Sequence, residues 1–179
     1  YFSWWYGPGR KVDNNIDFVG LLAAGATDVP GSQPEQAPDT PESATCQNYK
    51  NVILGAGKQL YRDNMMWTIG NEIGWDDART ADKYADDFVK WHSCLKSINP
   101  TFQVGSGALV SLYHKLPRDW NQGCSNNPSL DGGTAYFKKY IGLLRAKNSL
   151  PDFIVNHAYT YCRPGGATAN NFMAEIREQ

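Results

Sequence analysis

The chain alternates between short apolar runs and amphipathic stretches, and this alternation restricts its fold more than any other feature of the sequence. The apolar runs are bounded by Gly, Pro, Asn or Asp and are predicted strands at residues 2–6, 18–23, 65–69, 102–105 and 153–155. Strands that are apolar on both faces and separated by helices are typical of a parallel sheet that helices cover. The sequence therefore predicts an α/β fold.

Two amphipathic stretches carry apolar side chains at helical spacing. The first stripe has intervals of four, three and four residues and consists of Tyr84, Phe88, Trp91 and Leu95. The second stripe consists of Phe137, Tyr140, Ile141 and Leu144. A third helix is expected around residues 46–61, although Gly55 and Gly57 each lower its stability by up to about 1 kcal/mol relative to alanine.

The size and charge of the chain exclude several classes of protein. Its 179 residues are typical of one domain, and 17 basic against 18 acidic side chains give a formal net charge of −1. A nearly neutral chain has no long-range field to attract nucleic acid, so no nucleic-acid partner is expected. No apolar run approaches the roughly 20 residues that cross a bilayer, so no membrane span is expected.

Residues 26–43 differ from their surroundings in composition. They contain four prolines and almost no large apolar side chain, which predicts a surface loop. Such a segment either links two domains or lies at the rim of one. The apolar patterns on its two sides are each too short for a separate core, so a single domain over residues 1–179 is favoured.

Four widely spaced cysteines, Cys46, Cys94, Cys124 and Cys162, form no C-x-x-C or Cys/His metal motif. Their even number fits two disulfides in a secreted protein better than zinc, with four reduced buried thiols as the alternative. The sequence opens at Tyr1 with no signal-like segment, so any targeting signal is expected to have been removed or to lie outside it. Aromatic residues make up 13% of the chain, which fits a buried core and also a cleft whose rings stack on sugars.

The α/β pattern allows an open doubly wound sheet or a (β/α) barrel. A dinucleotide-binding fold would have G-x-G-x-x-G after its first strand, and the sequence lacks this motif because Gly55-Ala56-Gly57 has no third glycine. The polar residues instead follow the carboxyl ends of the predicted strands, where barrel enzymes place their chemistry. We therefore expect a TIM-type (β/α)8 barrel that needs no cofactor and no metal.

The strongest candidate for chemistry lies between Trp67 and Trp75, where an apolar strand leads into Asn71 and Glu72. A carboxyl group held among tryptophans and other apolar groups would lose hydration. This loss would raise the pKa of Glu72 and let it carry a proton near neutral pH, as a general acid must. The alternatives are a helix cap and a surface glutamate that happens to follow a strand.

Residues 65–72, which end in Gly70-Asn71-Glu72, resemble the fourth strand of clan A glycoside hydrolases, the retaining (β/α)8 glycosidases. Residues 152–159, which contain His157 and Tyr159, look like the sixth strand of that clan. A weaker similarity at the start of the chain points to fungal endo-β-1,3-glucanase-like members. The resemblance implies a retaining glycoside hydrolase that acts on a β-linked polysaccharide or oligosaccharide.

The resemblance also implies a role for each matching residue. Glu72 would be the general acid/base and Asn71 the ligand of the sugar 2-hydroxyl. His157 and Tyr159 would orient the nucleophile and line the cleavage subsite, with a purely structural histidine as the alternative. Because neighbouring strand residues point to opposite faces, at most one of Trp4 and Trp5 would face the cleft. The candidate stacking surfaces are Trp4, Trp5, Trp75 and Tyr159.

The nucleophile that the resemblance demands is missing. In the clan it is a glutamate at the end of the seventh strand, but after His157 only Glu175 and Glu178 remain, both in a predicted helix over residues 169–179. A closed barrel also takes about 200 or more residues. We therefore expect an incomplete barrel of about five or six βα units, whose open strand edges another chain or a missing segment would cover.

Three explanations of this deficit stay open: a fragment of a larger enzyme, a degenerate relative that is a non-catalytic carbohydrate-binding or structural protein, or an unrelated α/β protein. On the expected barrel, Cys46 and Cys94 fall on outer helices that flank residues 65–69, while Cys124 and Cys162 fall in loops at the mouth. Of the possible pairings, this placement favours Cys46 with Cys94 and Cys124 with Cys162. Disulfides would imply an extracellular location.

Overall fold

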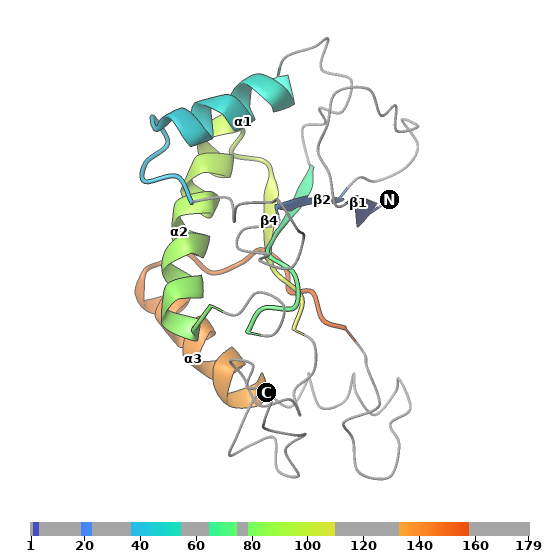
Figure 1. The fold of residues 1–179 in the computed structure, drawn as a ribbon, viewed down its shortest axis with the longest axis vertical. Coiled ribbons are helices and arrows are strands. Elements are labelled where there is room, and N and C mark those ends of the chain that lie inside the picture. Colours follow the sequence, from blue (N-terminus) through green and yellow to red (C-terminus); the bar gives the residue numbers. More distant parts are fainter. Residues whose placement is uncertain are drawn as a thin grey trace.

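The computed structural model describes residues 2–3, 19–22, 37–54, 65–74, 79–109 and 133–157. Along the chain, these ranges contain β1 (Phe2–Ser3), β2 (Val19–Leu22), α1 (Ala44–Leu54), β3 (Met66–Ile69), α2 (Ala81–Ile98), β4 (Gln103–Ser106) and α3 (Gly133–Ala146). Figure 1 shows the three helices together on one side of the strands. The described part of the chain is therefore an α/β structure with a helical layer on one face of a sheet.

The four strands form one parallel sheet in the order β1-β2-β3-β4. The last residues of β3 and β4, Ile69 and Ser106, lie side by side. The segment after α3 joins the β4 side through two isolated parallel bridges, Gly105 with Phe153 and Leu109 with Asn156. The carboxyl ends of β3, β4 and this segment consequently meet at one edge of the sheet.

The expectation of a TIM-type (β/α)8 barrel is wrong. The described strands form an open sheet whose first and last members do not pair, and the same ranges contain three helices. Alternating strands and helices specify parallel neighbours and a helical cover, whereas closure depends on strand number, tilt and stagger, which the pattern does not encode. The polar residues at strand ends favour a barrel no more than an open sheet, because both gather carboxyl ends at one edge.

The apolar stripe of α2 forms the centre of the core. The helix begins after Thr80, whose Oγ1 accepts a hydrogen bond from the backbone N–H of Lys83. All four residues of the predicted stripe are fully buried: Tyr84, Phe88, Trp91 and Leu95. The second predicted stripe lies on α3, which packs against α2 and fully buries Tyr140 and Leu144.

A disulfide joins α1 to α2. It connects Cys46 to Cys94, with 5.8 Å between their Cα atoms, and both cysteines are buried. This is the pairing that the sequence favours, while Cys124 and Cys162 lie outside the described residues. The first part of the helix expected at residues 46–61 is α1. Of the proline-rich segment, the structure describes residues 37–43, which lead into α1.

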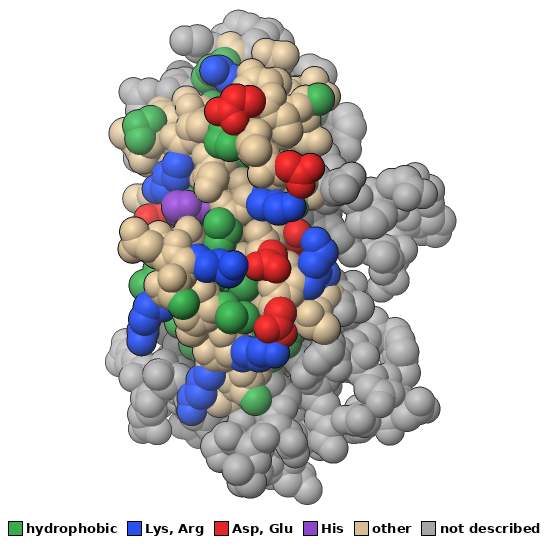
Figure 2. Space-filling view, turned by 90° about the vertical axis from the view of Figure 1, so that its left-hand side faces the viewer, with side chains coloured by type: hydrophobic (Ala, Val, Ile, Leu, Met, Phe, Trp, Pro, Cys, Tyr) green, Lys and Arg blue, Asp and Glu red, His purple; other side chains and the backbone are tan. Residues whose placement is uncertain are grey.

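The outer surface of the helices carries interspersed positive and negative side chains (Figure 2). The ion pair of Lys139 with Asp82 connects α3 to α2, and Lys147, directly after α3, pairs with Asp86 of α2. Solvent-exposed pairs contribute about 0–1 kcal/mol each, so the two helices are held together mainly by their buried apolar stripes. None of the helices in the described ranges has the length and apolar character required to cross a bilayer.

Candidate active site

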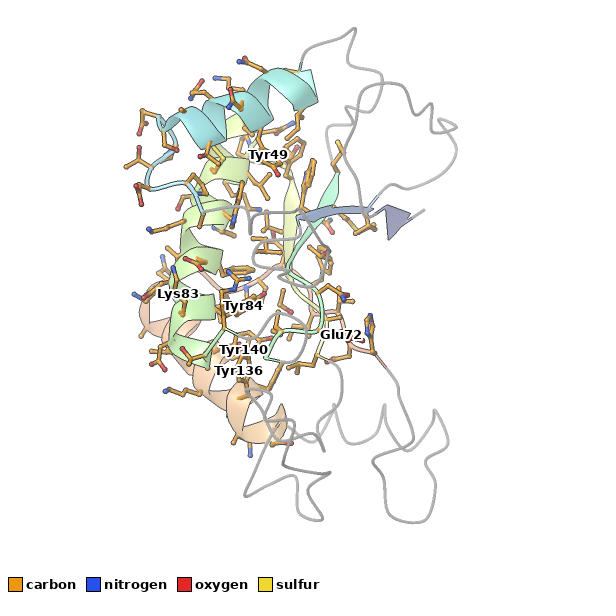
Figure 3. All side chains as sticks on the ribbon, in the orientation of Figure 1. Tyr49, Glu72, Lys83, Tyr84, Tyr136 and Tyr140 are labelled. Atoms are coloured by element: carbon orange, nitrogen blue, oxygen red, sulfur yellow. A yellow bond between two sulfur atoms is a disulfide. The ribbon has the colours of Figure 1, made fainter. Side chains whose placement is uncertain are left out.

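The chain turns sharply after β3 and brings Glu72 to the carboxyl end of the sheet (Figure 3). Three residues of this turn have positive φ: Gly70 at 86°, Glu72 at 44° and Gly74 at 79°. Glycine adopts this conformation freely, whereas an L-residue with a side chain is strained there by roughly 1–2 kcal/mol. The surrounding structure therefore holds Glu72 in a strained backbone, and such strain clusters at functional sites.

The carboxylate of Glu72 contacts the imidazole of His157, with 2.9 Å between Oε1 and Nδ1. The two residues are 85 positions apart in the sequence and meet because β3 and the segment after α3 end at the same edge of the sheet. The side chain of Glu72 is 12% exposed and that of His157 is 29% exposed. The pair is therefore largely shielded from water and still reachable from solvent.

This contact can hold a proton in two ways. When Glu72 is ionised, the Nδ1–H of His157 donates to Oε1, and when the carboxyl is protonated, it donates to an unprotonated Nδ1. Among the described residues, Oε2 of Glu72 has no hydrogen-bond partner. A bound molecule can consequently exchange a proton with this oxygen while His157 holds the other oxygen in place.

Residues 107–109 support both members of the pair through backbone hydrogen bonds. The N–H of Ile73, next to Glu72, donates to the carbonyl oxygen of Ala108 at 2.9 Å. The N–H of His157 donates to the carbonyl oxygen of Leu109, also at 2.9 Å. Residues 107–109 therefore tie the Glu72 turn to the His157 segment.

The structure brings three of the sequence-predicted residues to this edge, namely Glu72, His157 and the half-buried Asn71 that precedes Glu72 in the turn. Trp67 is fully buried, and its ring covers Gly20 of β2, where an added Cβ would lie 2.5 Å from the ring. Trp67 thus belongs to the core of the sheet. The predicted sugar-stacking residues lie outside the described ranges: Trp4, Trp5, Trp75 and Tyr159.

Sequence reasoning missed the part that residues 107–109 play. The available signal was Gly105-Ser106-Gly107 at the end of a predicted strand, because glycine there often marks a close approach of two backbones. A Cβ added at Gly107 would lie 2.6 Å from the carbonyl oxygens of Ile69 and Gly70. The two turns that carry the site are therefore in direct backbone contact.

In the part of the chain that the structure describes, no three His, Cys, Asp or Glu side chains are placed to hold a metal ion. Comparison of the chain with protein-family models, with curated proteins and with solved structures finds no match. A functional assignment therefore has to be argued from the chemistry of the Glu72–His157 pair and from the motifs that surround it.

Proposed function

We propose that this protein is a glycoside hydrolase that acts on β-linked polysaccharides and uses Glu72 as its general acid/base. One observation carries the proposal: a shielded carboxylate at the carboxyl end of a parallel sheet is paired through one oxygen with His157 at 2.9 Å. Its other oxygen has no partner among the described residues. The carboxyl ends of parallel strands are also where α/β proteins bind their ligands.

The proposed reaction uses each of these features. The leaving group of glycoside hydrolysis is a sugar alkoxide, which departs poorly unless a carboxylic acid protonates the glycosidic oxygen. Glu72 supplies this proton from Oε2 while the Nδ1–H of His157 donates to Oε1, and the resulting carboxylate later accepts a proton from the attacking water. His157 fixes the carboxyl group during both steps, and Asn71 binds the neighbouring sugar hydroxyl.

A retaining mechanism also needs a second carboxylate about 5–5.5 Å from the first. We assign this nucleophile to none of the described residues. The Cys46–Cys94 disulfide supports the further proposal that the protein is secreted, because disulfides persist in oxidising compartments.

The proposal is tested by assaying the chain on soluble β-glucans and xylans beside two isosteric variants. Glu72→Gln keeps the shape of the side chain and removes the acid, and we expect it to lower kcat by about 10²–10⁴-fold. Glu42→Gln is the matched control, because Glu42 is exposed near the start of α1. It should retain full activity.

Three outcomes would contradict the proposal. Undiminished hydrolysis by Glu72→Gln would show that the carboxyl group of Glu72 takes no part in the reaction. Binding of β-glucan without any turnover by the unaltered chain would favour a non-catalytic carbohydrate-binding protein on the same scaffold. Isothermal titration with a soluble oligosaccharide distinguishes this second outcome from complete inactivity, which would leave neither function standing.

A further inference from the structure

The hydroxyl of Tyr84 occupies a hydrogen-bonding position inside the sheet, although Tyr84 belongs to a helix. It donates to the carbonyl oxygen of Ile69 at 2.8 Å and accepts from the N–H of Gly107, also at 2.8 Å. Both contacts are fully buried. Figure 3 shows Tyr84 on α2, between the helical layer and the carboxyl end of the sheet.

The register of β3 and β4 shows what this hydroxyl replaces. The N–H of Gln103 donates directly to the carbonyl oxygen of Met65 at 2.9 Å. In a parallel ladder this relation repeats every two residues, so the N–H of Gly107 would meet the carbonyl oxygen of Ile69. At this step of the ladder the hydroxyl of Tyr84 bridges the two groups instead.

The ring of Tyr84 is fixed from several sides. The guanidinium of Arg79 lies over its face, 5.2 Å from the ring centre, and Tyr140 contacts it edge-on with 5.4 Å between ring centres. Arg79 is in turn held by Asp87, with 2.9 Å between Nη1 and Oδ2. The position of the hydroxyl is therefore set by contacts of α2 and α3 and by Arg79.

We infer that Tyr84 is a positioning residue that sets the spacing of Glu72 and His157 through residues 107–109. The segment that it contacts at Gly107 holds the turn after Glu72 through Ala108 and holds His157 through Leu109. Without the hydroxyl, the ladder step either closes directly or leaves two buried backbone groups unpaired. Either change moves residues 107–109 relative to the Glu72 turn. The effect on catalysis rests on the proposed function, whereas the effect on the Glu72–His157 contact does not.

The test measures this contact by the ¹⁵N chemical shift of Nδ1 of His157 in the full chain, which responds to the hydrogen bond that this nitrogen makes. Glu72→Gln gives the reference shift for an altered pair. Tyr84→Phe, which removes only the hydroxyl, should move the signal in the same direction. Tyr136→Phe is the matched control, because it removes a tyrosine hydroxyl that donates to the carbonyl oxygen of Arg79 at 2.9 Å, whereas the hydroxyl that accepts from the N–H of Gly107 belongs to Tyr84. It should leave the signal unchanged.

In the kinetic arm, Tyr84→Phe should lower kcat on β-glucan by about 10–100-fold and leave KM within about twofold, because misplacement of a catalytic group slows the chemical step. An unchanged Nδ1 signal in folded Tyr84→Phe would overturn the inference even if Glu72 proves catalytic. If the Nδ1 signal shifts in Tyr84→Phe but the unaltered chain hydrolyses no β-glucan, the inference is supported and the proposed function is contradicted. If Tyr84→Phe does not fold, amide exchange in the unaltered protein decides: a protected Gly107 N–H supports the bridge, and free exchange overturns it.

Discussion

Replacing Gly107 with alanine should destabilise the protein because two backbones meet at this residue. The added Cβ would lie 2.6 Å from the carbonyl oxygens of Ile69 and Gly70 and 2.7 Å from Cγ2 of Ile73. Two of these three atoms belong to the main chain and cannot rotate away. Gly107→Ala therefore requires a shift of one turn against the other.

The size of the effect follows from two opposing contributions. Overpacking a close contact costs about 1–3 kcal/mol, and the contact with main-chain atoms puts this site near the upper end. Alanine also restricts the conformations of the unfolded chain, which raises the free energy of unfolding by about 0.4–1 kcal/mol. The free energy of unfolding should therefore fall by about 2 kcal/mol, which lowers Tm by about 4–8 °C for a chain of this size.

The matched control is Gly142→Ala in α3. Nothing lies within 4 Å of an added Cβ at this exposed helical position, so alanine should raise the free energy of unfolding by about 0.5–1 kcal/mol. Urea unfolding of both variants, followed by circular dichroism and tryptophan fluorescence, measures the difference. If Gly107→Ala is as stable as Gly142→Ala, the close packing of the two turns is refuted.

Two other predictions concern the disulfide and an acid-sensitive ion pair. The Cys46→Ala/Cys94→Ala variant loses a crosslink between residues separated by 48 positions, and chain entropy alone predicts a loss of about 4 kcal/mol in urea unfolding; a loss below about 1 kcal/mol would contradict this reasoning. Burial raises the pKa of Asp152, but hydrogen bonds from Lys96 and from the N–H of Val104 outweigh it and leave the pKa below its ordinary value of 3.8. The ionised carboxylate therefore stabilises the fold above about pH 4, and this contribution disappears as the pH falls through the lowered value. Asp152→Asn should show a weaker loss of stability on acidification between about pH 4 and pH 2, and an unchanged acid profile would exclude the pair as its source.

The helices and strands were predictable because their signals are local. The stripe on α2 repeats at helical spacing, and all its members are buried as expected. The apolar run at residues 65–69 contains β3, and the run at residues 102–105 overlaps β4. Burial on both faces makes such runs nearly continuous in apolar residues, so periodicity and composition were enough to locate them.

The open sheet and the Tyr84 bridge were not predictable in the same way. Closure of a sheet depends on how its first and last strands approach each other, and no local pattern reports that geometry. In the sequence, the spacing of Tyr84 indicates only an ordinary member of an apolar stripe. Its ring fulfils that role, but the use of its hydroxyl depends on the carbonyl of Ile69 and the N–H of Gly107, which only the tertiary structure brings together.

The candidate site was predictable from the sequence in part. Glu72 was singled out because a carboxylate directly follows an apolar strand, and His157 because residues 152–159 resemble the sixth strand of clan A glycoside hydrolases. Parallel strands place their carboxyl ends at one edge, which made proximity a reasonable hypothesis. The direct contact between Oε1 and Nδ1 and the positive φ of Glu72 depend on the turn geometry, and the sequence alone did not indicate either.

The role of Glu72 is tested most directly by the dependence of the first-turnover rate on the leaving group. A dinitrophenyl β-glycoside expels a stable phenolate without protonation, whereas an alkyl β-glycoside needs the acid. Glu72→Gln should slow the alkyl substrate by about 10²–10⁴-fold and the dinitrophenyl substrate by less than about tenfold. Equal losses on the two substrates would show that Glu72 donates no proton to the leaving group and is not the general acid.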